Sequence, residues 1–196
     1  MNKGAGSFLP PWLLVGILLG GCSPKPPVTF TSPTGGYSFK VPASYEIVTK
    51  TATEQLDLLR QPLQVTTHFA GRTTNLPMFI TGHADLPREV ESSQVNRLLL
   101  SFMDACGVGS DRPLGEQKVY KVNGYPALEG VTHFRVKGGL WVRDGIKDSP
   151  MIGRCVVILA KDRLILMYFG VMEAWKFDSP EGPAFFNSLE IKERTP

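Results

Sequence analysis

The sequence predicts an α+β domain built on a mostly antiparallel β-sheet that is covered by helices. β-rich runs follow one another closely, and one short connection is Asn123-Gly124, the strongest short hairpin signal. Only residues 89–104 and 179–189 have the features of helices. Sixteen prolines and twenty glycines also favour many turns over long helices. Strands joined by hairpins pair antiparallel, which argues against a doubly wound parallel sheet.

Four strands are predicted in the first half of the domain. Residues 37–41 alternate between apolar and polar side chains, and residues 46–53 are rich in β-formers. Residues 63–70 alternate clearly, with Leu63, Val65, Thr67 and Phe69 on one face. Residues 77–84 carry apolar side chains on both faces, which predicts an inner strand covered on both sides.

The clearest helix is predicted over residues 89–104. Pro87 precedes it and Gly107 follows it, as is typical of helix ends. Its apolar positions recur at spacings of three and four, which places one side of the helix on a core. These positions are Val95, Leu98, Leu99, Phe102 and Met103.

The second half predicts two hairpins and a short helix. Residues 116–122 and 125–136 flank the Asn-Gly turn, and residues 154–160 and 164–171 form the next pair. A polar, glycine-containing loop is expected between the hairpins. Residues 179–189 predict a terminal helix docked on the sheet by Phe185, Phe186 and Leu189.

The N-terminus has the three parts of a secretory signal peptide. Lys3 lies in a short first part, an apolar run follows over residues 8–19, and Gly20-Gly21 supplies small residues. The run holds about a dozen residues, whereas a membrane-spanning helix needs about twenty. We therefore expect residues 1–21 to be removed on export.

The end of this segment, Leu19-Gly20-Gly21-Cys22, resembles the lipobox of bacterial lipoproteins. The resemblance implies that Cys22 becomes the first residue and carries a diacylglycerol, which would hold the protein at a membrane of the cell envelope. Because Ser23 rather than Asp follows Cys22, the resemblance slightly favours the periplasmic side of the outer membrane.

The predicted mature chain has three parts. Residues 22–34 are rich in proline and predict an extended tether, although Val28–Thr31 could already be a first strand. Residues 35–192 form a single folded domain, and residues 193–196 form a charged tail.

Composition excludes some partners. Removal of residues 1–21 takes away one charged side chain, Lys3, and leaves 20 basic and 18 acidic residues. This near balance predicts no nucleic-acid partner, because such a partner requires a concentrated basic face. We predict no cofactor.

With Cys22 acylated, Cys106 and Cys155 are the remaining cysteines. An exported protein meets an oxidising compartment, so the two could form a disulfide. Two buried free thiols are the alternative, because unpaired cysteine is among the most buried residue types.

Three histidines, His68, His83 and His133, fall on predicted strands, and they could converge as a metal site if the strands were neighbours. They lack local ligand spacing, so we predict no metal. Trp141 and Arg143 in the polar loop are candidates for contact with a partner protein.

No motif indicates catalysis. The serines lack the Gly-x-Ser-x-Gly context of a hydrolase, and Cys106 has no base at a recognisable spacing. The sequence therefore predicts a protein that is not an enzyme.

Three segments of the domain carry a resemblance to a known family, namely Gly36-Tyr37-Ser38-Phe39-Lys40-Val41-Pro42, Tyr120-Lys121-Val122-Asn123-Gly124-Tyr125-Pro126-Ala127 and Phe185-Phe186-Asn187-Ser188-Leu189. Through them the domain resembles the PsbP-like superfamily, which includes the extrinsic PsbP subunit of photosystem II and bacterial DcrB-type lipoproteins. The resemblance implies an antiparallel sheet between helical layers, an α/β/α sandwich. It does not imply photosynthesis, and it transfers no functional residue.

These observations together favour a membrane-tethered exported lipoprotein with a non-enzymatic binding or assembly role and an unknown protein partner. The alternative is a periplasmic lipoprotein that binds a small molecule or a metal. A hydrolase is less favoured, because it would need a convergent triplet of nucleophile, histidine and acid.

Overall fold

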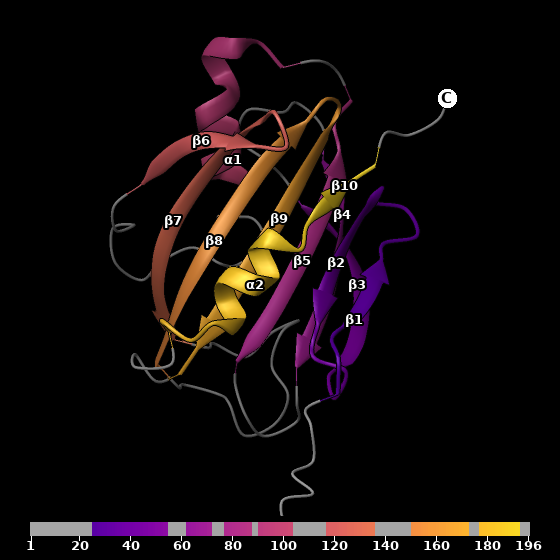
Figure 1. Ribbon diagram of the computed structural model, residues 1–196. Helices are drawn as coiled ribbons and strands as arrows, with labels where there is room; N and C mark the ends of the chain where they lie inside the picture. The colour runs from indigo at the N-terminus through magenta and orange to yellow at the C-terminus, as the bar shows by residue number, and fades with distance from the viewer. Residues whose placement is uncertain are drawn as a thin grey trace, which may run out of the picture.

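The computed structural model of the protein describes residues 25–54, 62–71, 77–87, 90–103, 117–135, 150–172 and 177–192. Figure 1 shows a large twisted sheet with helix α1 behind it and with helix α2 and a smaller sheet in front. Among the described residues, no helix is long and apolar enough to span a membrane.

The large sheet has seven strands, and every neighbouring pair in it is antiparallel. The predicted fold class, a mostly antiparallel sheet with helices, is therefore confirmed. In spatial order the strands are β3 (Glu46–Glu54), β4 (Leu63–Gly71), β5 (Met78–Asp85), β9 (Arg163–Val171), β8 (Pro150–Ala160), β7 (Tyr125–Arg135) and β6 (Lys118–Val122).

The predicted hairpins are present. Asn123 and Gly124 connect β6 to β7, and their φ angles of 50° and 84° are the two positive values that a type I′ turn requires. The connection between β8 and β9 contains Lys161, which also has a positive φ of 58°. Strand β8 begins earlier than predicted, at Pro150 rather than residue 154.

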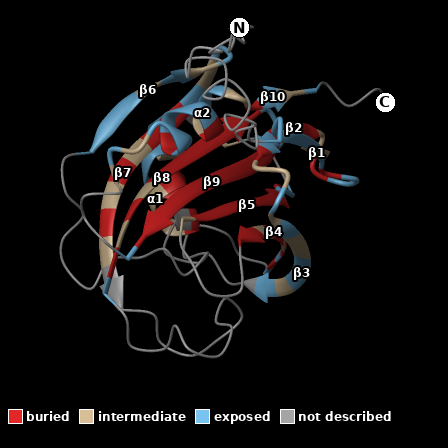
Figure 2. Cartoon of the chain, turned by 60° about the horizontal axis from the view of Figure 1, so that its bottom comes forward, coloured by how far each residue is buried: buried red, intermediate tan, exposed pale blue. Residues whose placement is uncertain are grey.

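The middle of this sheet is buried on both faces. All nine residues of β9 are buried, and β5 is buried from Met78 to Ala84. Figure 2 shows these central strands in red while the edge strands β3 and β6 are largely pale or tan. The prediction of an inner strand over residues 77–84 is confirmed, and such strands require a cover on each face of the sheet.

One face is covered by a short 3-10 helix, η2 (Ser92–Gln94), and by α1 (Val95–Met103). Leu98, Leu99 and Phe102 are fully buried in the core between α1 and the sheet. The α-helix is shorter than the predicted range of 89–104. A 3-10 turn over Ser92–Gln94 precedes it.

The opposite face is covered by a three-stranded sheet and by α2 (Glu181–Asn187). The small sheet has the order β1 (Val28–Thr31), β2 (Tyr37–Val41) and β10 (Glu190–Ile191). Its side chains and those of α2 form a second core on the large sheet. The implied α/β/α sandwich is thus modified, because a sheet and one short helix, rather than helices alone, cover this face.

The boundary between tether and domain needs a correction. β1 pairs with β2 from Val28 to Thr31, and Ser32 beyond it is buried. The folded domain therefore includes residues 28–34, and the boundary predicted at Gly35 is too late. Of the four prolines that suggested the tether, Pro24, Pro26 and Pro27 precede Val28, whereas Pro33 lies after β1 in the connection to β2.

Candidate functional site

Half of the predicted site residues lie outside the described part of the chain. Cys22, with the lipobox before it, Cys106, Trp141 and Arg143 are all among them. Cys155 lies on β8 and is fully buried in the core that faces α1. Lipid attachment, the Cys106–Cys155 disulfide and the partner contact of the polar loop therefore stay predictions.

The structure brings together two of the three histidines. His68 of β4 pairs with Thr81, and His83 of β5 pairs with Thr66, so both imidazoles lie on one face of the sheet. Their ring centroids are 6.0 Å apart. His133 lies on β7, which β9 and β8 separate from β5. Within the described residues, no group of three His, Cys, Asp or Glu side chains could hold a metal ion.

Hydroxyl groups surround the two buried imidazoles. Ser32 Oγ lies 2.9 Å from His68 Nε2, and Thr49 Oγ1 lies 2.9 Å from His68 Nδ1. At His83, Thr34 Oγ1 is 3.0 Å from Nε2 and Tyr37 Oη is 3.5 Å from Nδ1. A neutral imidazole has one donor and one acceptor, and a hydroxyl can serve either role.

These contacts join the small sheet to the large one. Ser32, Thr34 and Tyr37 lie in or beside the β1–β2 connection, whereas His68 and His83 belong to the large sheet. Desolvation by burial lowers the pKa of His68 from 6.5 to about 4, so this ring is neutral at pH 7. His68 thus acts as an uncharged structural contact.

A hollow opens next to this pair. Its volume is about 400 Å³, and its polar lining includes Gln64, Thr66 and His83. Gln64 Nε2 donates to Thr53 Oγ1 over 2.7 Å, and the Thr66 and Thr51 hydroxyls are 3.1 Å apart. Gln64 and Thr66 are therefore engaged with their neighbours, while the exposed side chain of Asp85 also lines the hollow.

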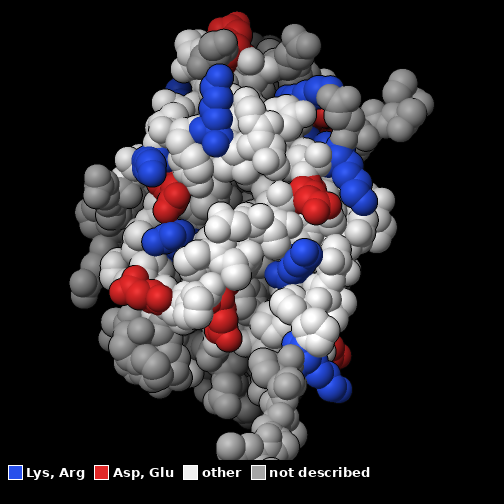
Figure 3. Space-filling view, in the orientation of Figure 1, with Lys and Arg blue, Asp and Glu red and all other residues white. Residues whose placement is uncertain are grey.

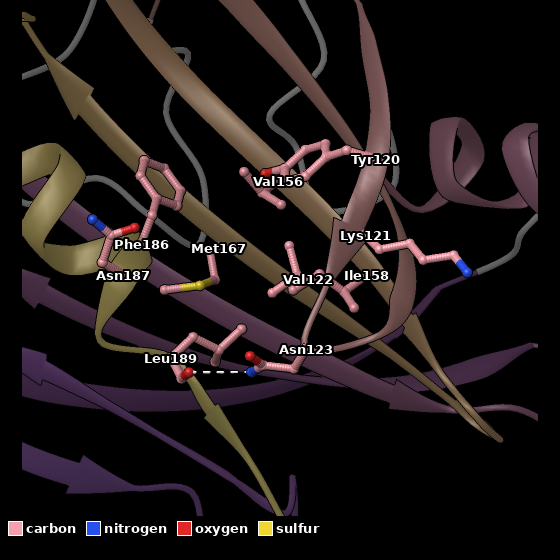
Figure 4. A pocket seen from close by; sticks show the side chains of 10 residues that line it. All are labelled: Tyr120, Lys121, Val122, Asn123, Val156, Ile158, Met167, Phe186, Asn187 and Leu189. Carbon is pink, nitrogen blue, oxygen red and sulfur yellow. Dashed lines mark hydrogen bonds between the residues drawn. The ribbon is translucent and has the colours of Figure 1, made fainter.

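The stronger candidate site lies on the face that carries α2. A cavity of about 300 Å³, called here the α2–β6 groove, separates α2 from the β6–β7 hairpin. Figure 4 shows Phe186 of α2 on one side, Tyr120 and Val122 of β6 on the other, and Met167 between them. The groove is lined by Tyr120, Lys121, Val122, Asn123, Val156, Ile158, Met167, Phe186, Asn187 and Leu189.

The floor and the rim of the groove differ in exposure. Val156, Ile158 and Met167 form the floor and are at most 3% exposed. Tyr120, Val122 and Phe186 form a half-buried apolar rim. The surface that the groove offers to a ligand is therefore the rim. One end is closed by Asn123, whose Nδ2 donates to the Leu189 carbonyl over 3.4 Å.

Charged side chains continue from the rim across the sheet. Arg154 Nε lies 3.4 Å from Glu129 Oε1, and Lys118 Nζ lies 5.6 Å from the centre of the Tyr120 ring. Desolvation, then the charge of Glu129 and its hydrogen bond, raise the pKa of Tyr120 far above 10. Tyr120 is consequently a neutral phenol at every physiological pH.

Sequence reasoning missed this groove. The Asn-Gly turn placed Asn123 at the tip of a hairpin, and the pattern of residues 179–189 placed Phe186 on a helix. No local sequence pattern indicates that a gap remains between this helix and β6, because the gap depends on where α2 docks on the sheet. The sequence therefore placed the groove-lining residues on the correct strands and helix, but it did not predict that they form one site.

The histidine pair predicts a pH-dependent stability. The unfolded chain binds a proton at His68 near pH 6.5, whereas the folded protein does so only near pH 4. Stability is therefore complete above pH 6.5 and falls by about 3 kcal/mol as the pH drops to 4. Urea unfolding at pH 7 and pH 4 measures the loss, and His68→Gln should reduce it. An equal loss in the variant would show that another group is responsible.

No protein-family model and no curated protein matches the chain. Among solved structures, it is similar to cyanobacterial PsbP (CyanoP) from Synechocystis sp. PCC 6803, known from a solution structure. The TM-score is 0.50 at 12% sequence identity, over 88% of this chain and 96% of the cyanobacterial one. At this identity the similarity shows the fold alone. The chain has a PsbP-like fold.

Proposed function

We propose that this protein is a membrane-tethered exported domain with a non-enzymatic role in the assembly of a protein complex. The α2–β6 groove is its contact surface, and its occupant is an apolar side chain of a protein partner. The observation that supports this most is the rim of Tyr120, Val122 and Phe186, which gathers half-buried apolar groups beside a preformed cavity.

The size and openness of the groove favour a protein partner. Ligand sites for small molecules have about 300 to 1,000 Å³ and enclose most of the ligand. The α2–β6 groove is at the lower limit, and its floor is already covered by the rim. A single side chain of a protein partner could occupy a groove of this size, because the rest of the partner would contact the surface around it.

The groove assignment is testable by cross-linking in cells. A photoreactive phenylalanine derivative at Phe186 should yield a cross-linked protein adduct of one defined mass. The same group at Val119, which is 58% exposed on the same sheet, should not. Val119 is the matched control because it lies on β6 next to Tyr120 but projects to the opposite face. Equal labelling from both positions, or none from Phe186, would contradict the assignment.

The tether is tested separately at Cys22. Cys22→Ala should abolish labelling by radioactive palmitate and release the protein from the membrane fraction, because the acyl chains are its proposed attachment. Cys106→Ala, which removes a cysteine elsewhere, should leave both readouts unchanged. Unaltered label or membrane retention in Cys22→Ala would refute lipid attachment at this residue.

A further inference from the structure

The rim of the α2–β6 groove carries more basic than acidic charge on its β6 side. Lys118 and Lys121 are both exposed on this edge strand. The carboxylate of Glu129 is already engaged by Arg154 at 3.4 Å and by the Tyr120 hydroxyl. Figure 3 shows pale side chains in the middle of this face, with basic and acidic groups interspersed around them.

Lys118 is the lysine best placed to act on an occupant of the groove. Its side chain points to the same face of β6 as those of Tyr120 and Val122, because alternate residues of a strand share a face. Its Nζ lies 5.6 Å from the centre of the Tyr120 ring. Figure 4 shows the Lys121 side chain pointing away from the cavity. Lys118 is paired in register with Glu129, and Arg154 lies on the same face, so the apolar rim ends at a group of two basic side chains and one carboxylate.

We propose that the partner segment presents an apolar side chain flanked by acidic residues, with a carboxylate facing Lys118. This inference rests on the proposed function and specifies the chemistry of the partner. The apolar side chain lies between Phe186 and the Tyr120–Val122 side of the groove. The acidic residue complements the charge of the basic edge. This complementarity discriminates among partners and raises their association rate.

The test uses the full chain held in phosphatidylcholine nanodiscs and three synthetic peptides of about nine residues. The first has a central phenylalanine flanked by aspartate and glutamate. The second replaces that phenylalanine with serine, and the third replaces the acidic residues with lysine. Fluorescence anisotropy of labelled peptides measures binding, and sodium chloride should weaken it because exposed charges are screened.

The first peptide should bind and the other two should not bind detectably. Lys118→Glu should weaken binding of the first peptide about tenfold and create binding of the lysine peptide. Lys50→Glu on β3, at the opposite edge of the sheet, makes the same charge change and should alter neither. Circular dichroism on each variant establishes that it is folded.

Two results would overturn the inference. In one, the serine peptide binds as well as the first peptide, or Lys118→Glu has the same effect as Lys50→Glu. In the other, the peptides fail while dodecanoate binds and is lost in Phe186→Ser, which identifies a small amphiphile as the occupant. If Phe186 still cross-links a protein in cells while no peptide binds, the acidic-anchor chemistry is wrong and the proposed assembly role stands.

Discussion

The rest of the structure depends on the burial of β5, β9 and β8 on both faces of one sheet. Phe79, Ile165 and Phe169 face one side, while Ile80 and Leu166 face the other, and all are at most 3% exposed. Burying apolar surface contributes about 25 cal/mol per Å², so leaving either face open would be costly. The α1 layer and the layer of small sheet plus α2 satisfy this constraint from opposite sides.

The layer formed by the small sheet and α2 is held to the large sheet by polar contacts as well as by apolar packing. Arg163, at the start of β9, is 4% exposed and donates to the carbonyls of Gly35 and Lys192, which flank β2 and β10. Gly36 has a φ of 62°, and a Cβ at this position would collide with the Arg163 guanidinium. The buried histidines contact the same turn, His68 through Ser32 and His83 through Thr34. These contacts fix the small sheet at one end of the large sheet, and among the described residues α2 lies toward the β6 end, with the groove between them.

The sequence predicted the strands and hairpins that depend on local residue patterns. The alternation of residues 63–70, the apolar character of residues 77–84 and the Asn123-Gly124 turn each led to a strand or hairpin that the structure contains. The small sheet escaped because β2 pairs with β10 across most of the chain; Ser38 and Glu190 are 152 residues apart. The sequence allowed the two histidines to converge on neighbouring strands, but their contacts with the β1–β2 connection and the groove escaped for the same reason. Each depends on which distant elements dock together, and that docking leaves no periodic signal in either segment.

The central claim is that the incomplete cover of the α2 face is a binding surface, and the most direct test is the size of the native assembly. Val122→Asp places a charge on the rim, whereas Val119→Asp places the same charge on the opposite face of the same strand. Both proteins would be extracted from membranes in mild detergent and separated by native electrophoresis. We expect Val119→Asp to migrate in the same large complex as the unaltered protein, and Val122→Asp to migrate at the mass of the single chain. Identical migration of both variants in the large complex would contradict it.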